Sequence, residues 1–210
     1  MAGHSSVLTD GGRLSQIDRG LYRVERFMAL LSGIAVFSLM VLAVVSVGGR
    51  NLFNAPLPGY VDWIQQLMPL IAFMGVSFTQ RDGGHIRMDI LVGRLKGRAL
   101  WGAEFITTAF MLVLIVLLIW GSWAHFERSF DFTRPLWSRD SSIDIALPLW
   151  PAKLLAPVAF SVLALRLVLQ LWGYARAFAQ NLAEPVAVPL VRSAAELAAE
   201  EAELVSGGKE

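Results

Sequence analysis

The sequence predicts an all-α membrane protein with four transmembrane helices and short amphipathic helices at the membrane interface. Of its 210 residues, 55% are hydrophobic and only 17% are charged, whereas soluble domains average roughly 45–50% and about 25%. The apolar residues form four long runs, and the lysines and arginines gather between particular runs. Buried helices of a large soluble protein are the alternative, but so short a chain cannot surround four uniformly apolar helices with polar residues.

Each apolar run is long enough to cross a bilayer. The hydrocarbon core is about 30 Å thick, and a helix of about 20 residues spans it. We predict spans near residues 27–49, 62–80, 104–124 and 151–174. The first run follows 26 polar and charged residues and exceeds the length of a signal-peptide core. We therefore expect it to be a membrane helix and not a cleaved leader.

The second and fourth spans contain polar residues. Gln65, Gln66 and Pro69 lie in the second span, so we expect a kink at the proline and neighbouring helices beside the amides. Arg166 interrupts the fourth span. Two interpretations of Arg166 stay open. Its side chain extends along the helix to the cytoplasmic headgroups, or it forms an ion pair with a carboxylate on a partner.

The distribution of lysine and arginine predicts that both termini are cytoplasmic. With the N-terminus inside, the cytoplasmic segments carry four cations in the N-terminal flank, five in the second loop and four in the tail. The opposite side carries one in the first loop and four in the third. Cytoplasmic loops of membrane proteins are enriched in these residues, so the asymmetry favours this orientation.

The chain divides into three predicted regions. They are a cytoplasmic or interfacial segment at 1–26, a four-helix transmembrane domain at 27–178 and a cytoplasmic acidic tail at 179–210. Apolar residues recur at helical spacing in the first region, at Leu14, Ile17, Leu21 and Val24. This pattern is typical of an amphipathic helix in the headgroups, and it fits a cytoplasmic extension of the first span equally well.

The two longer loops have different compositions. The second, at 81–104, mixes apolar residues with five cations and a Gly83-Gly84 turn, which predicts a short helix on the inner membrane surface. The third, at 125–150, is long and rich in Phe and Trp. Loops of this length are usually functional or disordered, and its aromatic content argues against disorder. We predict an ordered element on the outer face that serves as a docking surface.

Several classes of chemistry are absent from the sequence. It has no cysteine, which excludes disulfides and thiolate metal sites, and its net charge of +1 gives no basic field for nucleic acid. It contains no phosphate-binding glycine loop and no nucleophile or zinc-protease motif. Inside their first and last residues the predicted spans contain no acidic residue, although ion relays usually need one. No internal repeat is visible. An accessory membrane subunit without catalytic centre or cofactor is the simplest interpretation.

Three stretches resemble one known family. They run from Arg50 to Leu91, from Ile143 to Pro157 and from Leu163 to Leu171, and the run His-Ile-Arg-x-Asp at His85 to Asp89 is the most specific part. With the four-span layout, they resemble the small membrane subunit of tripartite ATP-independent periplasmic (TRAP) transporters, the DctQ-like family. The resemblance covers roughly residues 20 to 178. The family often has a glutamate pair early in the second span, where this chain has Gln65 and Gln66.

The resemblance implies a multi-pass protein of the bacterial inner membrane that works with two partners. A large permease subunit would carry the substrate and sodium sites. A periplasmic binding protein would capture an organic acid such as a dicarboxylate, a keto acid or a sugar acid. The small subunit would support the large one and help to dock the binding protein, without a catalytic centre of its own.

Seven charged or polar residues near the ends of spans are candidates for contact with a partner subunit or with lipid: Arg50, Asp62, Arg81, His85, Arg87, Asp89 and Arg166. Four of them lie with Asp82 in the nine residues from Arg81 to Asp89. Two interpretations of that cluster stay open. It is a local ion-paired staple that also contacts anionic lipid, or it is a direct contact with the large subunit.

Two other function classes compete with the accessory subunit. A membrane anchor of a respiratory oxidoreductase would need paired histidines for a haem, but His85 and His125 fall on opposite membrane faces in the predicted topology. A stand-alone channel would need pore-lining charge or a repeat. Haem absorbance in the purified protein distinguishes the anchor from the transporter subunit.

Overall fold

The computed structural model describes residue 7, residues 12–55, 57–81 and 98–180, and residue 188 of the chain. Within these residues the chain is helical with one ordered loop. The helices are α1 (Arg13–Phe53), α2 (Tyr60–Met74), α3 (Val76–Arg81), α5 (Arg98–Ser129) and α6 (Trp150–Gln180), with a single 3-10 turn, η1 (Pro135–Trp137).

The four predicted spans are confirmed. Four helical segments are long and apolar enough to cross a membrane, namely Arg13–Phe53, Tyr60–Arg81, Arg98–Ser129 and Trp150–Gln180. Each contains one predicted span and extends beyond it. The extensions arise because a helix continues into polar sequence wherever tertiary contacts hold it, whereas apolar runs mark only the part within hydrocarbon.

Helix α1 continues without a break from the polar N-terminal segment into the first apolar run. Of the two interpretations of residues 14–26, the structure therefore has the extension of the first helix. At 1.5 Å per residue the 41-residue helix is about 60 Å long, roughly twice the hydrocarbon thickness. The predicted apolar stripe is only partly buried. Leu14 is 4% exposed, but Ile17 and Val24 are 51% and 47% exposed.

The second span consists of two helices. Helix α2 continues through Pro69 and ends at Met74, and α3 begins at Val76. The interruption falls at Gly75, six residues beyond the proline. Proline removes a backbone donor and glycine weakens a helix interior, so the region between them is where a helix is most easily interrupted. The predicted kink at Pro69 itself remains a prediction.

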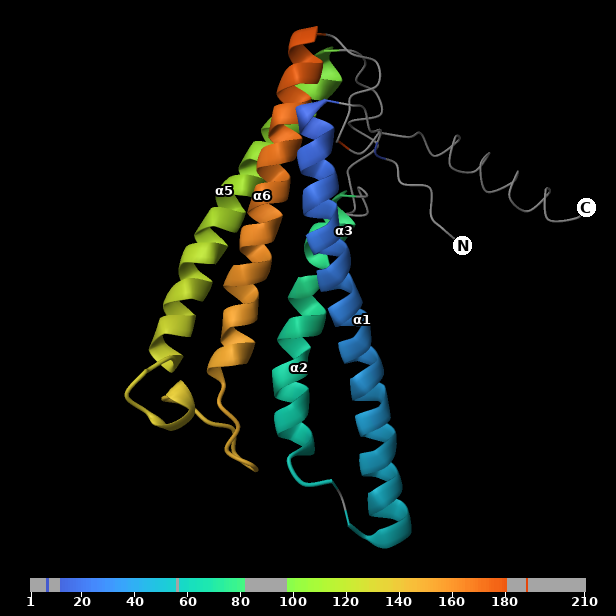
Figure 1. The fold of residues 1–210 in the computed structure, drawn as a ribbon, viewed down its shortest axis with the longest axis vertical. Coiled ribbons are helices and arrows are strands. Elements are labelled where there is room, and N and C mark those ends of the chain that lie inside the picture. Colours follow the sequence, from blue (N-terminus) through green and yellow to red (C-terminus); the bar gives the residue numbers. More distant parts are fainter. Residues whose placement is uncertain (1–6, 8–11, 56, 82–97, 181–187, 189–210) are drawn as a thin grey trace, which may run out of the picture.

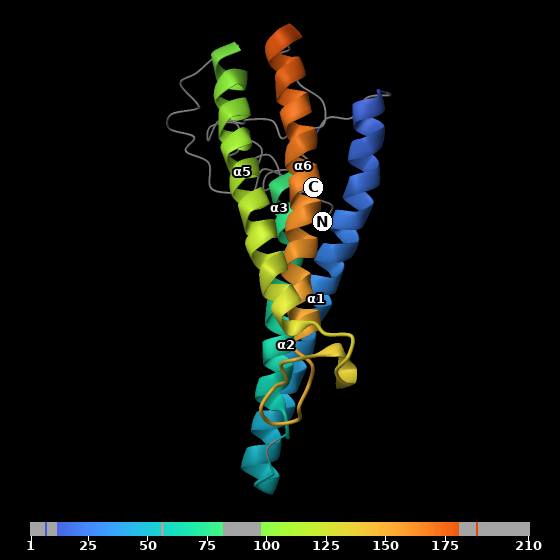
Figure 2. The same ribbon diagram turned by 90° about the vertical axis from the view of Figure 1, so that its left-hand side faces the viewer.

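Helix α6 occupies the centre of the bundle. Eleven of its 31 residues are buried, against seven of the 41 residues in α1. In Figure 1, α1 lies beside α2 and α5 lies beside α6. Figure 2 shows α6 between the N-terminal ends of α1 and α5, with α3 behind it. The last span of the sequence therefore joins the other three.

Two apolar clusters fix α6 to its neighbours. One contains Met28, Met74 and Ala159, from α1, α2 and α6. The other contains Ile115 on α5 with Leu163 and Leu167 on α6. The hydroxyl of Ser32 on α1 also donates to the carbonyl of Ile71 on α2 at 3.1 Å. Most other large apolar side chains of α1 and α5 face outward.

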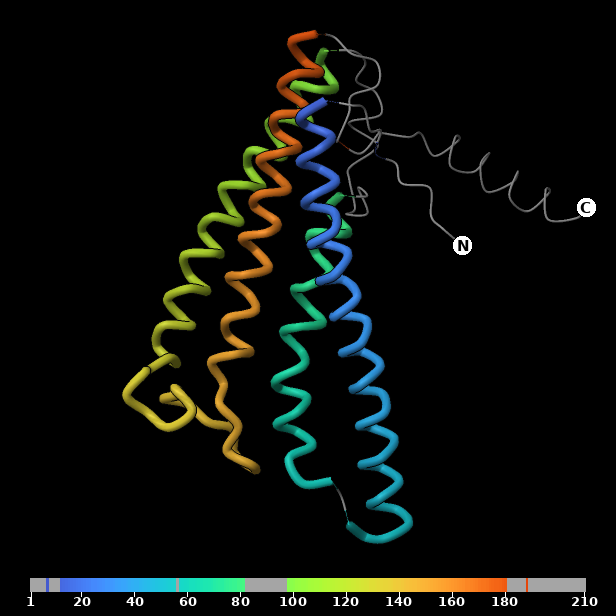
Figure 3. The backbone as a smooth tube through the Cα atoms, in the orientation of Figure 1, coloured from blue at the N-terminus to red at the C-terminus, as the bar shows by residue number. Residues whose placement is uncertain are grey.

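The α5–α6 loop, residues 130–149, is folded, in agreement with the prediction of an ordered element. Isolated β-bridges join Phe130 to Ser138 and Ser141 to Pro148, and η1 lies between them. Aromatic rings of Phe126, Phe130 and Trp150 pack against one another at the base of the loop. The backbone trace in Figure 3 shows this loop at the same end of the molecule as the turn from α1 to α2.

Three predictions fall outside the described residues. They are the short surface helix of the second loop, the His85–Asp89 cluster within it, and most of the acidic tail predicted at 179–210.

Candidate functional site

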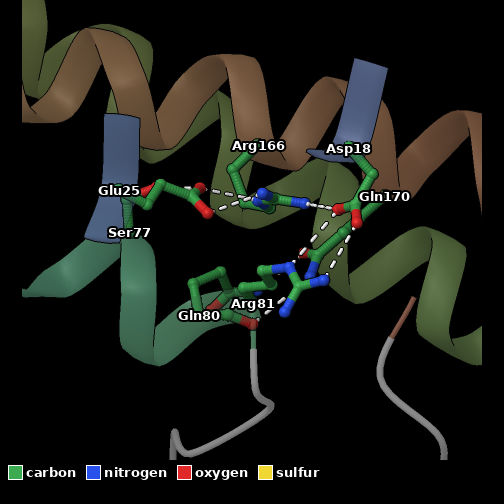
Figure 4. Close-up of polar contacts among 7 residues, drawn as sticks. All are labelled: Asp18, Glu25, Ser77, Gln80, Arg81, Arg166 and Gln170. Carbon is green, nitrogen blue, oxygen red and sulfur yellow. Dashed lines mark hydrogen bonds and ion pairs between the residues drawn. The ribbon is translucent and has the colours of Figure 1, made fainter. Parts of the chain in front are cut away.

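A cluster of buried charges joins α1, α3 and α6. We call Asp18, Glu25, Arg81 and Arg166 the charge network; Figure 4 shows it with its polar neighbours. The guanidinium of Arg166 donates two hydrogen bonds to the carboxylate of Glu25, at 2.7 Å from Nε and 2.6 Å from Nη2. Its Nη1 donates to Oδ1 of Asp18. Arg166 therefore lies between two carboxylates of the same helix.

Arg81, the last residue of α3, completes the network. Its Nη2 lies 3.0 Å from Oδ2 of Asp18. Its guanidinium carbon also lies 4.1 Å from the ring centre of Tyr22, four residues after Asp18 on α1. An arginine over an aromatic face is attracted by the negative face of the ring. Arg81 thus fastens the end of the second span to α1.

Neutral polar groups extend the charge network on both sides. The hydroxyl of Ser77 on α3 donates to Oε1 of Glu25 at 2.6 Å. The amide of Gln80 donates to Oε1 of Gln170 on α6 at 2.9 Å, and the amide of Gln170 donates back to the carbonyl of Gln80 at 3.3 Å. Every carboxylate of the network therefore accepts more than one hydrogen bond, as buried charges require.

The charge network is almost fully removed from solvent and balanced in formal charge. The exposed fractions are 0% for Asp18, Glu25 and Arg166 and 4% for Arg81. Two acids face two arginines, so the group is neutral. In a low-dielectric interior ion pairs are strong, but each unpaired charge is costly. A buried cluster of this kind is therefore stable when its positive and negative charges are equal in number.

The structure contradicts the first interpretation of Arg166 and agrees with the second in the ion pair alone. The side chain does not reach outward to headgroups, and its carboxylate partners are in the same chain, not in another protein. The inference that the spans are free of acids also needs correction. Glu25 lies two residues before the predicted first span, yet its helix carries it to an arginine inside the fourth span. The contact arises from the N-terminal extension of α1.

At the opposite end of the bundle, Asp62 in the first turn of α2 holds the α5–α6 loop. Its Oδ2 accepts hydrogen bonds from the hydroxyl of Ser142 at 2.7 Å and from the backbone N–H groups of Asp144 and Ile145 at 3.1 and 2.8 Å. The amide of Gln66, one turn later, donates to the carbonyl of Pro148. Asp62 is 2% exposed, and one oxygen of its carboxylate accepts all three hydrogen bonds from the loop.

Two further carboxylates shape the loop from within. The backbone N–H and hydroxyl of Thr133 and the guanidinium of Arg139 donate to Asp131, and they lower the pKa of this carboxyl to about 2. Hydrogen bonds from the ammonium of Lys153 and the hydroxyl of Ser129 lower the pKa of Asp140. The loop thus keeps its shape through contacts between residues close in sequence.

The surface of this loop is apolar at several points. The exposed fractions are 97% for Ile143, 76% for Phe132, 68% for Leu136 and 52% for Trp137. Leu136 and Trp137 have positive φ angles of 55°, a region that side chains rarely adopt without support. The indole N–H of Trp150 supplies support by donating to the carbonyl of Leu136 at 3.0 Å.

The structure places four of the seven sequence-predicted site residues. Arg81 and Arg166 meet in the charge network, while Asp62 is at the far end of the bundle and Arg50 is exposed in the last turn of α1. His85, Arg87 and Asp89 lie outside the described residues. Whether any of the seven contacts a partner or lipid remains a prediction.

Sequence reasoning missed Asp18, Glu25 and Gln170. A signal for the acids was present, because Leu14, Asp18, Leu21, Glu25 and Met28 recur every three or four residues. That spacing places them on one face of a helix. The face of α1 that packs inward carries these acids together with Leu14 and Met28, so the apolar residues alone do not identify it.

The described residues show no clustered metal ligands. Groups of three or more His, Cys, Asp or Glu side chains in metal-binding geometry are absent from them. His125, the one histidine among these residues, is exposed on α5. A haem ligand pair is therefore not found in this part of the chain.

Comparison with known proteins agrees with the arrangement of helices. Residues 39–177 match the family described as "Tripartite ATP-independent periplasmic transporters, DctQ component". A protein of Haemophilus influenzae named "Putative TRAP transporter small permease protein" is 28% identical over 106 residues. That match covers 49% of this chain and 65% of the relative. The chain therefore spans just under two thirds of the relative's length.

Proposed function

Because the chain belongs to the DctQ component family of TRAP transporters, a family of transporter subunits and not of enzymes, we propose that it is the small permease subunit of a binding-protein-dependent importer. The importer takes up an organic acid, such as a dicarboxylate, keto acid or sugar acid, coupled to sodium. The observation that carries the proposal is the family match over residues 39–177, which reaches into all four membrane-spanning helices.

The proposed role is to support a large permease subunit that holds the substrate and sodium sites. Large apolar side chains cover the outer face of α1 at a spacing of three and four residues: Phe27, Leu30, Ile34, Phe37, Val41 and Val44, each 43–69% exposed. Such a stripe fits either lipid chains or a helix of another subunit.

The proposed location is the bacterial inner membrane, with both termini in the cytoplasm. The distribution of lysine and arginine favours this orientation. It puts the charge network near the cytoplasmic side and the α5–α6 loop on the periplasmic side. Single cysteines at Ser5, Ser141 and Ser206 test it, since the chain has none of its own. Labelling of Ser141→Cys from the cytoplasmic side would overturn the orientation.

In this orientation the α5–α6 loop is available to the periplasmic binding protein. Its exposed apolar side chains, above all Ile143 and Trp137, give a surface that the Asp62 contacts hold in place. We therefore assign the docking role to this loop. Ile143→Asp should lower uptake at limiting binding protein without reducing the amount of membrane complex. Asn51→Asp, at an exposed residue in the last turn of α1, is its control.

Co-purification and uptake test the function as a whole. With a tag on this chain, a large permease subunit should co-purify, and deletion of this chain should abolish binding-protein-dependent uptake in cells. Liposomes that contain this chain alone should show no substrate uptake. Uptake by such liposomes, or full uptake in the deletion strain, contradicts the proposal. Haem absorbance in the purified chain would instead favour an oxidoreductase anchor.

The second-loop cluster can be tested in the same assay. Arg87→Glu should remove the large subunit from the purified complex if the cluster contacts it. Arg128→Glu, at an exposed arginine of α5 near the loop end, is the matched charge reversal. Unchanged co-purification and uptake with Arg87→Glu would leave the ion-paired staple as the explanation of the cluster.

A further inference from the structure

We propose that the charge network is a register lock, which specifies the turn of α1 that lies against each turn of α6 and α3. The inference concerns how this chain attains its own fold, and it goes beyond the proposed transport role. It starts from the buried surface of α1, which is unusually polar. Four of its seven buried residues are polar or charged, the seven being Leu14, Ser15, Asp18, Glu25, Met28, Ala35 and Ser46.

Apolar contacts alone cannot set the register of α1. Lipid chains are as apolar as leucine, so helices in a bilayer gain little by exchanging lipid contacts for contacts with each other. The apolar residues of α1 that do pack inward are few, and its remaining apolar residues face outward along most of its length. A shift of α1 by one turn would exchange one set of apolar contacts for another of similar energy.

The charge network does not tolerate such a shift. Asp18 and Glu25 are seven residues apart, which places them on one face about 10 Å apart along the axis. The guanidinium of Arg166 bonds to both carboxylates, using three of its nitrogens. One turn of a helix is about 5.4 Å, longer than any of these hydrogen bonds. A shift of one turn therefore leaves at least one carboxylate buried without its arginine.

Helix α3 makes the arrangement specific in three dimensions. The guanidinium of Arg81 donates to Oδ2 of Asp18, and the hydroxyl of Ser77 donates to Oε1 of Glu25. Because Ser77 and Arg81 are four residues apart on α3, they too mark successive turns of one face. These contacts together fix the positions of α1, α3 and α6 relative to one another along the helix axes.

The lock needs no partner protein, because its charges balance within the chain. It also closes late in synthesis. Arg166 is 148 residues from Asp18 and 141 residues from Glu25, and it belongs to the last span. Only when α6 has entered the membrane can the polar N-terminal part of α1 pack against the bundle. The small subunit would then reach its final register before it meets the large subunit.

Cross-linking of this chain alone, expressed without other subunits, tests the lock. The chain has no native cysteine. Leu14 on α1 and Leu169 on α6 form one buried cluster, so Leu14→Cys with Leu169→Cys reports the native register. Leu14→Cys with Gly173→Cys is the matched shifted pair, because Gly173 is also buried on α6 and lies one turn after Leu169. With the network intact, the first pair should cross-link and the second should not.

Reversing one charge of the network should allow α1 to leave its native position along α6. Arg166→Glu leaves three acids with one arginine, and Glu25→Arg leaves three arginines with one acid. Each should reduce native-pair cross-linking by about tenfold or more, as expected when a buried charge loses its partner. The exchanged variant, Glu25→Arg with Arg166→Glu, restores neutrality and should recover the native pair. An exchanged variant as poor as the single ones would overturn the proposal.

A fully apolar variant separates register from stability. Replacement of all four charges by leucine leaves no unpaired charge within the network, and such replacements often preserve stability. The lock predicts that this variant inserts and remains helical but cross-links both the native and the shifted pair. Cross-linking of the native pair alone would show that apolar packing sets the register, and the proposal would be wrong. None of these results depends on transport, so they are separable from the proposed function.

Discussion

The two ends of the bundle use carboxylates in opposite ways. In the charge network, carboxylates from α1 accept hydrogen bonds from arginines of α3 and α6 that are 63 to 148 residues away. In the α5–α6 loop, Asp131 and Asp140 are held by residues within 13 positions, and their partners Arg139 and Lys153 are partly exposed. One end joins helices, and the other shapes a surface.

The difference teaches where mutations should matter. Exposed ion pairs contribute little because water and salt screen them. A buried charge that loses its partner is costly, because no water replaces the lost hydrogen bonds. Asp62 is intermediate, since it is buried like the network but holds a loop. Changes at the network should affect the whole fold, and changes at the loop should affect only its shape.

The largest expected effect is that of Arg166→Met. It leaves Asp18 and Glu25 buried with one arginine between them, and removal of one partner of a buried pair costs about 3–5 kcal/mol in soluble proteins. The free energy of unfolding in detergent measures this. Arg176→Met, at an exposed arginine on the same helix, is the control and should stay within about 0.5 kcal/mol. Equal losses of unfolding free energy in the two variants would contradict the expectation that a buried, paired arginine contributes more to stability than an exposed one.

A smaller and local effect is expected from Asp62→Ala. The hydroxyl of Ser142 and the N–H groups of Asp144 and Ile145 lose their acceptor. Hydrogen exchange at Asp144 and Ile145 should become severalfold faster, while cross-linking between Leu14→Cys and Leu169→Cys should not change. A loss of that cross-link would mean that loop and network are coupled.

Gly59→Ala should distort the turn that precedes α2. Gly59 has a φ angle of +70°, and an added Cβ would lie 2.5 Å from Cδ1 of Ile145. The left-handed backbone costs other residues about 1–2 kcal/mol, and Ile145 must also move. The unfolding free energy should fall by about that amount. Gly121→Ala, in α5 with nothing within 4 Å of the added atom, is the control and should be neutral or stabilising.

The smallest effect is the response of the loop to acid. The pKa of Asp131 is lowered from 3.8 to about 2, so its contribution to loop order is present above pH 3.8 and is lost as the pH falls toward 2. Fluorescence of Trp137, the last residue of η1 in the same loop, should stay constant down to about pH 4 and change below it. Asp131→Asn should abolish that change. A transition centred above pH 5 would contradict the assignment.

The sequence by itself determined the membrane-spanning layout. Four apolar runs of sufficient length predict four spans, because the hydrocarbon thickness imposes a minimum length that local composition satisfies or does not. The aromatic composition of the third loop also predicted order, and the stretches around Arg50–Leu91 and Ile143–Pro157 pointed to the family later matched over residues 39–177. All of these are properties of neighbouring residues.

Only the tertiary structure decided what the polar residues do. Arg166 was noticed as an interruption of an apolar run, but its partners are separated from it by more than 140 residues. Asp18 and Glu25 precede the first apolar run, where acids are normally solvated. Their burial depends on α1 continuing through residue 26 and on α6 lying beside it. The burial of Asp62 likewise depends on the α5–α6 loop lying against α2. Ion pairing across a bundle depends on which helices are adjacent and on how they are aligned along their axes. The sequence around each residue carries no information about either.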